Sequence, residues 1–245
     1  MFAFACFRNN HFYKLFVRDA SGAFLPESQI LGAIKAILAD NSPKDQNPVG
    51  ILTTENRDKW AEIHLDLYAT NKKALDDVDS ALFALSLESQ SVEDPTKLSR
   101  LFLFGDGRNR WFDKSFSLLV TENGKAAVNF EHSWGDGVAV VRFLDEVYGA
   151  SNASPLVQAA SGFRAPEKIQ WNVRALPFFF FSVVDLVEKV NWLKLFPLFF
   201  LFSLAEPRGD QRNTGSWKAL RCRLERYGLE GSCHLHRQKA AAEGL

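Results

Sequence analysis

The stretch NFEHSWGDGVAVV, residues 129–141, joins two different periodicities of apolar residues. Before the turn, alternate residues fall on one side of a predicted strand: Ala126, Val128, Phe130 and His132. After the turn, apolar residues recur at helical spacing: Val140, Phe143, Leu144 and Val147. The sequence therefore predicts a strand, then a turn that carries His132 at the end of the apolar face, and then a helix buried on one side.

Upstream of this stretch, the segment FSLLV (116–120) precedes TENGK, in which Asn123-Gly124 is a strong signal for a β-hairpin. Other segments are predicted from apolar spacing and turn residues: a strand at the N-terminus, a strand at 11–18, a helix at 27–39 after Pro26, a short buried strand at 49–54, a helix at 56–69 capped by Thr54, and a strand at 80–87. Alternation of strands and helices indicates an α/β fold.

The bulk composition excludes several classes of protein. The chain has 245 residues, with 29 Lys+Arg and 29 Asp+Glu, so its formal net charge is zero. Electrostatic capture of nucleic acid needs a basic excess, and we expect none. Three scattered cysteines are too few for a disulfide framework, which favours a reducing compartment. The N-terminus has neither the long apolar core of a signal peptide nor the Arg-rich, Ser-rich character of a transit peptide.

The motif His132, Asp136 and Gly137 makes chemical sense at a strand-to-helix junction. A neutral imidazole can take a proton from a hydroxyl or thiol near pH 7. An aspartate four residues later can pair with a cation and fix the turn, and glycine lets a backbone or a substrate come close. The alternative is a histidine without a catalytic role, whose hydrogen bonds are satisfied within a turn, with Asp136 as a helix cap.

The segment GRNRWFDKS (107–115) is polar, aromatic and charged in quick succession. Its central residues form a candidate wall of an active site next to the histidine strand: Arg110, Trp111, Phe112 and Asp113. The alternative is a loop anchored by Trp111 and Phe112.

A metal site and a bound cofactor are not predicted. Four soft ligands occur near the C-terminus, Cys222, Cys233, His234 and His236, but their spacing is not that of a zinc site. The chain contains no P-loop, dinucleotide fingerprint or Gly-x-Ser-x-Gly motif.

Three stretches together resemble the carnitine/choline acyltransferase family, in its order and at about its spacing: GILTTENRDKWAEI (50–63), LFGDGRNRWFDKSFSLLV (103–120) and GKAAVNFEHSWGDGVAVVRFLDEVY (124–148). The resemblance runs from about residue 8 to about residue 172 and is strongest to the family's mitochondrial, long-chain type. It implies part of a two-domain fold, a mixed sheet flanked by helices, with the second domain largely missing. CoA and acyl-CoA are then substrates and not cofactors.

The resemblance also implies roles for the turn residues. His132 would deprotonate the carnitine hydroxyl, or the CoA thiol in the reverse direction. Asp136, supported by Gly137, would pair with an arginine of the second domain and hold the turn in shape. Long-chain acyl-CoA and carnitine would be the partners, on the matrix side of the inner mitochondrial membrane.

Beyond about residue 150 the character of the sequence changes. We expect residues 1–150 to be a partial acyltransferase domain carrying the histidine, residues 151–172 a linker-like continuation, and residues 173–245 a divergent tail outside the family. The Phe-rich part, 175–205, is divided by charges and prolines into pieces too short for a clean membrane span.

Motifs of the family's second half are not recognised after residue 172, so alternative functions stay open. The chain is either an acyltransferase or a catalytically inactive fragment of one, at most a binding partner of the complete enzyme. A protein that binds a membrane surface through the Phe-rich segment is a third hypothesis, which the charges and prolines disfavour. We also expect residues 10–150 to expose apolar surface that a second domain would cover.

Overall fold

The computed structural model describes residues 3–133, 135–173 and 202–204. Its centre is a mixed sheet with the strand order β6-β2-β1-β3-β4-β5-β7. Strands β1, β3 and β4 are parallel, and the outer pairs are antiparallel. The strands are β1 (Ala3–Arg8), β2 (His11–Phe16), β3 (Ala84–Leu87), β4 (Phe116–Val120), β5 (Ala126–Phe130), β6 (Glu167–Ile169) and β7 (Phe202–Leu204).

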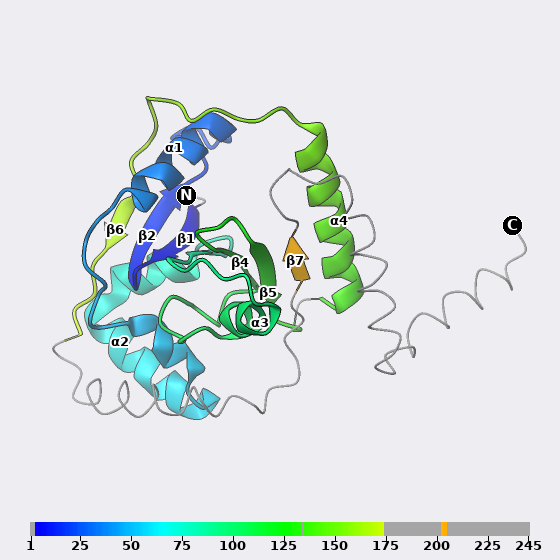
Figure 1. Ribbon diagram of the computed structural model, residues 1–245. Helices are drawn as coiled ribbons and strands as arrows, with labels where there is room; N and C mark the ends of the chain where they lie inside the picture. The colour runs from blue at the N-terminus through cyan, green and yellow to red at the C-terminus, as the bar shows by residue number, and fades with distance from the viewer. Residues whose placement is uncertain (1–2, 134, 174–201, 205–245) are drawn as a thin grey trace, which may run out of the picture. The chain divides into compact units, whose positions relative to one another are not determined.

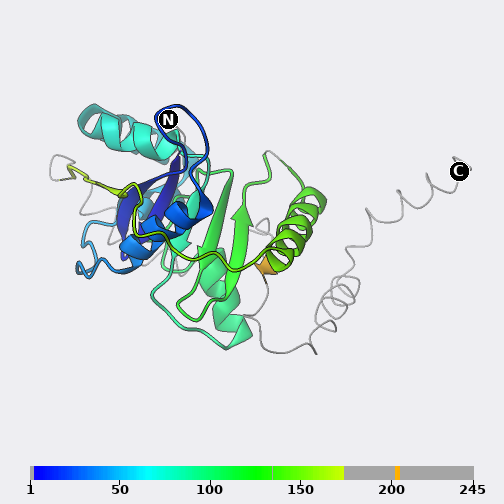
Figure 2. The same cartoon turned by 90° about the horizontal axis from the view of Figure 1, so that it is seen from above.

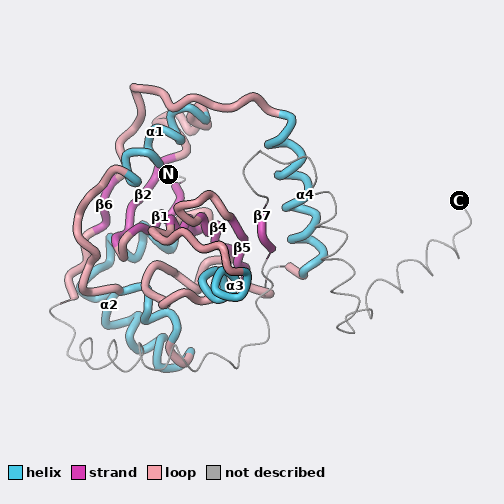
Figure 3. The backbone as a smooth tube through the Cα atoms, in the orientation of Figure 1, coloured by secondary structure: helices cyan, strands magenta, loops and turns pink. Residues whose placement is uncertain are grey.

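Helices cover both faces of this sheet, which confirms the predicted α/β class (Figures 1 and 2). They are α1 (Glu27–Leu38), the 3-10 helix η1 (Val49–Thr54), α2 (Arg57–Asp79), α3 (Pro95–Leu103) and α4 (Gly137–Ala153). One face packs against α1 and α4, and the other packs against η1, α2 and α3. The alternation of helices and strands along the chain is visible in Figure 3.

The β4–β5 hairpin and the helix after the His132 turn are confirmed. Gly124 has a φ of +77° at the hairpin, a conformation that glycine adopts without steric cost. The β1–β2 hairpin turns on Asn9 and Asn10, with φ values of 51° and 65°. Asparagine is among the few residues that tolerate this region, so the sequence of this turn fits its backbone.

Two local predictions are wrong. The segment 49–54 is a 3-10 helix and not a strand, because a short, fully buried apolar run carries no periodicity that separates the two. Its turns are closed by Thr53 Oγ1, which donates to the Gly50 carbonyl at 2.7 Å. The cap of α2 is Asn56 and not Thr54: its side chain accepts from the backbone N–H of Asp58 at 3.0 Å.

Three elements were not predicted. Helix α3 begins after Asp94, whose side chain accepts from the Lys97 N–H at 2.8 Å, and has Pro95 at its first position. This Asp-Pro pair is the signal that could have revealed it. Strand β6 lies in the segment expected to be linker-like and pairs with β2. Strand β7 lies in the divergent tail and pairs with β5.

Candidate active site at the end of β5

His132 lies just beyond the end of β5, beside the beginning of β4. Phe130 pairs with Phe116 across the two strands, and the Glu131 N–H donates to the Ser115 carbonyl at 2.9 Å. The ring of His132 lies 5.2 Å from the ring of Phe130, centroid to centroid. The imidazole is half-buried. The imidazole therefore continues the apolar face of β5 beyond the end of the strand, as the alternation of apolar residues in the sequence predicted.

That apolar face packs against α4. Val128 and Phe130 of β5 form a small core with Val140 and Leu144 of the helix. Phe143 and Val147, which were predicted on the same buried stripe, are each 43% exposed. The apolar surface of α4 is thus wider than the area that the sheet covers.

Asp136 caps helix α4. Its Oδ1 accepts a hydrogen bond from the Ala139 N–H at 3.0 Å, while its side chain faces solvent. A β-carbon added to Gly135 or Gly137 would meet no atom within 4 Å, so the turn is bordered by open space. The cap is the role the structure displays for Asp136, and its pairing with an arginine of a second domain stays a prediction.

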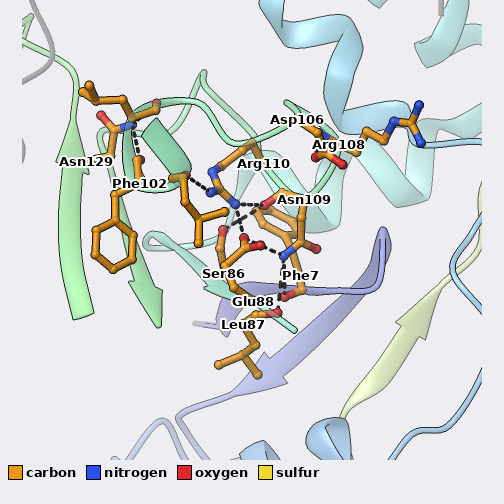
Figure 4. Close-up of polar contacts among 12 residues, drawn as sticks. Phe7, Ser86, Leu87, Glu88, Phe102, Asp106, Arg108, Asn109, Arg110 and Asn129 are labelled. Atoms are coloured by element: carbon orange, nitrogen blue, oxygen red, sulfur yellow. Dashed lines mark hydrogen bonds and ion pairs between the residues drawn. The ribbon is translucent and has the colours of Figure 1, made fainter. Parts of the chain in front are cut away.

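Arg110 lies in the protein interior, 2% exposed. Its guanidinium forms an ion pair with Glu88 and donates to the Leu101 carbonyl at 2.6 Å (Figure 4). The side chain of the neighbouring Asn109 donates to Glu88 at 3.1 Å, and the backbone carbonyl of Asn109 accepts from Ser86 Oγ at 3.0 Å. These contacts partner most of the polar atoms of the cluster, as is usual for buried polar groups, whereas Asn109 Oδ1 and Arg110 Nε are buried without a hydrogen-bond partner among the described residues.

Trp111 and Asp113 are also engaged in packing. Trp111 is 1% exposed and lies between three aromatic rings, those of Phe12, Trp60 and Trp171. Asp113 accepts hydrogen bonds from Trp60 Nε1 at 2.6 Å and from Arg57 at 2.8 Å.

The Phe112 N–H donates to Thr53 Oγ1 at 3.2 Å. These contacts match the alternative of an anchored loop, and the wall role of Arg110, Trp111, Phe112 and Asp113 stays a prediction.

The structure brings only one end of this loop to the histidine. Asn109 Nδ2 lies 3.4 Å from the Leu87 carbonyl, at the end of β3, whereas Ser115 is bonded to Glu131, next to His132. Because the adjacent strands β3 and β4 are parallel, the end of β3 and the beginning of β4 lie at opposite ends of the strands. The loop therefore crosses the sheet from the Arg110–Glu88 pair to the His132 turn.

Glu88 and Asn129 are among the buried polar residues that the sequence reasoning missed. Asn129 lies on β5, 6% exposed, and its Nδ2 donates to the Leu103 carbonyl at 2.9 Å. The available signal was an amide side chain inside a strand whose neighbours are apolar, because such a group needs a buried partner.

The other described histidines occupy surroundings of a different kind. His11 contacts the Pro43 carbonyl at 2.9 Å, and His64 lies 3.4 Å from Asp79 and packs edge-on against Trp60. Burial raises the pKa of the Cys6 thiol, which disfavours the thiolate form that a nucleophile needs.

Within the described ranges, no group of three or more His, Cys, Asp or Glu side chains could hold a metal ion. The candidate ligands Cys222, Cys233, His234 and His236 lie outside the described residues. No helix in the described part of the chain is long and apolar enough to cross a bilayer.

The family model for choline/carnitine O-acyltransferases matches residues 3–176 of the chain. The chain therefore belongs to this family. The sequence is similar to mitochondrial carnitine O-palmitoyltransferase 2 of Rattus norvegicus, with 48% identity over 155 residues, and to that of Homo sapiens, with 46%. It is 28% identical over 178 residues to carnitine O-acetyltransferase of Rattus norvegicus.

The palmitoyltransferase matches cover 63% of the chain but 24% of each relative, and the acetyltransferase match covers 67% and 28%. The chain thus spans about a quarter of the length of the curated relatives that it matches. The fold and family are those expected from the three sequence stretches.

Proposed function

We propose that this chain contributes the general base of acyl transfer between acyl-CoA and carnitine, and that the base is His132. The observation that supports this most strongly is its position: an imidazole at the end of a buried strand, followed by a turn bordered by open space at Gly135 and Gly137. A base at such a place can meet a substrate while its strand stays fixed by packing.

The chemistry follows from the two substrates. The neutral imidazole of His132 takes the proton of the carnitine hydroxyl, and the oxygen attacks the thioester carbonyl of acyl-CoA. When the tetrahedral intermediate collapses, the carbon–sulfur bond breaks and the sulfur leaves with the proton from the imidazolium. The products are acylcarnitine and CoA, and no acyl-enzyme is formed. General-base catalysis of this kind typically contributes about 10²–10⁴-fold in rate.

Long-chain acyl groups are the proposed substrates. The relatives named palmitoyltransferases are 46–48% identical to the chain, and those named acetyltransferases are 27–28% identical. The same relatives are named as mitochondrial, which supports a mitochondrial location. Association with the matrix side of the inner membrane extends this proposal.

A second candidate is a chain without turnover of its own, at most a partner of a complete enzyme. The specific observation in its favour is that the chain spans about a quarter of the relatives' length. A general base alone does not provide the positioning of two substrates, which supplies a large part of enzymatic rate enhancement.

One assay separates the two candidates: transfer of palmitoyl from CoA to carnitine by the chain and by its His132→Ala variant. Turnover that falls about 10²–10⁴-fold in His132→Ala, and is kept in the control His64→Ala, supports catalysis by this chain. Undetectable turnover in the unmodified chain supports the second candidate.

The base role is then tested at the matching histidine of rat carnitine O-palmitoyltransferase 2. Loss of turnover with retained acyl-CoA binding supports His132 as a base, and full activity of that variant would contradict it.

A further inference from the structure

Helix α2 folds back on itself at Asn71, whose backbone leaves the helical region with a φ of −130° and a ψ of 30°. His64 Nε2 lies 3.4 Å from Asp79 Oδ2 as a result. A straight helix would separate these two positions by about 22 Å. The last turn of α2 therefore lies beside the first half of the same helix.

The side chain of Lys114 binds this last turn. Its ammonium donates to the backbone carbonyls of Asp79 at 2.6 Å and Ala81 at 2.8 Å. The last carbonyls of a helix lack partners within the helix, and a cation is favourable beside them. The last turn of α2 contains no basic residue of its own. Lys114, far along the chain, therefore supplies the cation.

The loop that carries Lys114 is attached to both halves of α2. Lys114 is half-buried, and burial lowers the pKa of its ammonium, against the opposing effect of Asp79 and Asp113. Since burial removes water from the ammonium, the two carbonyl contacts replace hydrogen bonds that it would otherwise lose. The preceding residue, Asp113, accepts from Trp60 Nε1 in the first half of α2 at 2.6 Å.

The residue after Lys114 holds the strand that leads to His132. The Ser115 carbonyl accepts from the Glu131 N–H at 2.9 Å, and His132 follows Glu131 directly. One backbone hydrogen bond thus connects the attached loop to the residue before the imidazole. The turn after His132 is bordered by open space at both of its glycines, so we expect the strand side to fix the imidazole.

We propose that Lys114 is a positioning residue for the imidazole of His132. Its contacts with the end of α2 fix the Ser115 carbonyl, and the hydrogen bond from Glu131 transmits that fixed position to the His132 turn. The catalytic consequence rests on the proposed function: a group displaced by about 1 Å can lose roughly 10²-fold in rate. The effect on the position of the imidazole does not rest on it.

Substitutions of Lys114 separate its hydrogen bonds from its packing. Lys114→Met keeps an apolar stem and removes the donors, whereas Lys114→Arg keeps both the charge and the donors. Lys114→Gln keeps N–H donors on a shorter, uncharged side chain and should give a smaller effect than Lys114→Met, in the same direction. Lys72→Met is the matched control, because Lys72 is 64% exposed and pairs with Asp76 within α2.

Two NMR measurements on the full chain test the proposal: the imidazole signals of His132 and the exchange of the Glu131 amide with solvent. In Lys114→Met the His132 signals should shift, and the Glu131 amide should exchange at least about tenfold faster, because hydrogen bonds from a charged group are lost. The Ala127 amide, in the centre of β5, should stay protected. Lys114→Arg should restore both signals, and Lys72→Met should change neither.

Turnover provides a further readout. In transfer of palmitoyl from CoA to carnitine, Lys114→Met should lower kcat by roughly 10–10²-fold and leave the KM for carnitine unchanged, and Lys114→Arg should recover kcat. Absence of turnover in the unmodified chain would contradict the proposed function alone, since the NMR measurements decide the positioning role without substrate.

Two outcomes would overturn the proposal. The first is a folded Lys114→Met variant in which the His132 signals and the exchange of the Glu131 amide are unchanged. The second is a Lys114→Arg variant as defective as Lys114→Met. If Lys114→Met does not fold, the Ala127 amide loses protection as well, and Lys114→Gln decides. An unchanged Glu131 amide in Lys114→Gln would then overturn the proposal.

Discussion

Arg110 and Asn129 donate hydrogen bonds to the same end of one helix. The guanidinium of Arg110 lies 2.6 Å from the Leu101 carbonyl, and Asn129 Nδ2 lies 2.9 Å from the Leu103 carbonyl (Figure 4). The last carbonyls of a helix have no partner within the helix and need one when they are buried. Helix α3 therefore joins the loop that carries Arg110 to the strand that leads to His132.

The Arg110–Glu88 pair should be essential for stability. Arg110→Ala leaves a buried carboxylate without its cation and the Leu101 carbonyl without its donor, and removal of one partner of a buried pair typically costs about 3–5 kcal/mol. The double variant Arg110→Met/Glu88→Gln should cost less, because no charge stays buried. Urea denaturation measures both.

The control for this prediction is the exposed ion pair of Arg57 with Asp113, where the arginine side chain is 66% exposed. Arg57→Ala should change the free energy of unfolding by less than about 1 kcal/mol. An Arg110→Ala variant as stable as Arg57→Ala would contradict the structural role assigned to the buried pair.

Gly50 should tolerate no side chain. A β-carbon at this position would lie 2.2 Å from the Arg110 carbonyl oxygen, a backbone atom that cannot move aside cheaply. We expect Gly50→Ala to lower the free energy of unfolding by about 1–3 kcal/mol or more. Gly137→Ala is the matched control, because nothing lies within 4 Å of its added carbon. Thermal denaturation should show a clear decrease for the first variant and no decrease for the second.

Asp40 should make stability depend on pH in the acidic range. Hydrogen bonds from Ser42 first, and then from Tyr13 and Lys168, hold the pKa of Asp40 well below its usual range. The folded state therefore favours the carboxylate, and this stability is present above the unfolded pKa of about 4 and is lost as pH falls below it.

The test of this prediction is Asp40→Asn. The side chain is 25% exposed, so screening limits the cost at pH 7 to about 1 kcal/mol. Urea titrations at several pH values should show that the difference in the free energy of unfolding between the unmodified chain and Asp40→Asn decreases as pH falls below about 4. Asp66→Asn, on the exposed surface of α2, should stay within about 0.5 kcal/mol of the unmodified chain. If Asp40→Asn lowered the free energy of unfolding by the same amount at every pH from 7 to 3, the lowered pKa of Asp40 would be refuted.

The parts of the fold that could be predicted are those with strong local signals. Asn123-Gly124 fixes the β4–β5 hairpin, and the change of period at Gly137 marks the end of the turn with His132. The segment 49–54 could not be assigned correctly, because its shape depends on burial against the Arg110 backbone, far along the chain. Strands of three residues, such as β6 and β7, are too short to show periodicity and are defined by their partners.

The candidate site was predictable only in part, for a related reason. The alternation of β5 placed His132 correctly, but the interior position of Arg110 and Trp111 follows from contacts with Glu88 after β3, with Trp60 of α2 and with Leu101 of α3. Helix α3 itself was missed, so the sequence could not show that the carbonyls at its end require donors such as Arg110 and Asn129.

The last prediction separates two roles of Asp136. As a helix cap, its oxygen accepts from the Ala139 N–H, and asparagine offers an equivalent oxygen. Asp136→Ala should therefore cost about 1 kcal/mol in urea denaturation, whereas Asp136→Asn should cost only a few tenths, from the lost charge at the helix N-terminus. Asn56→Ala, which removes the cap of α2, provides an internal scale for the loss of one cap. Equal losses for Asp136→Asn and Asp136→Ala would show that the negative charge matters more than the cap, as an ion pair with an arginine would require.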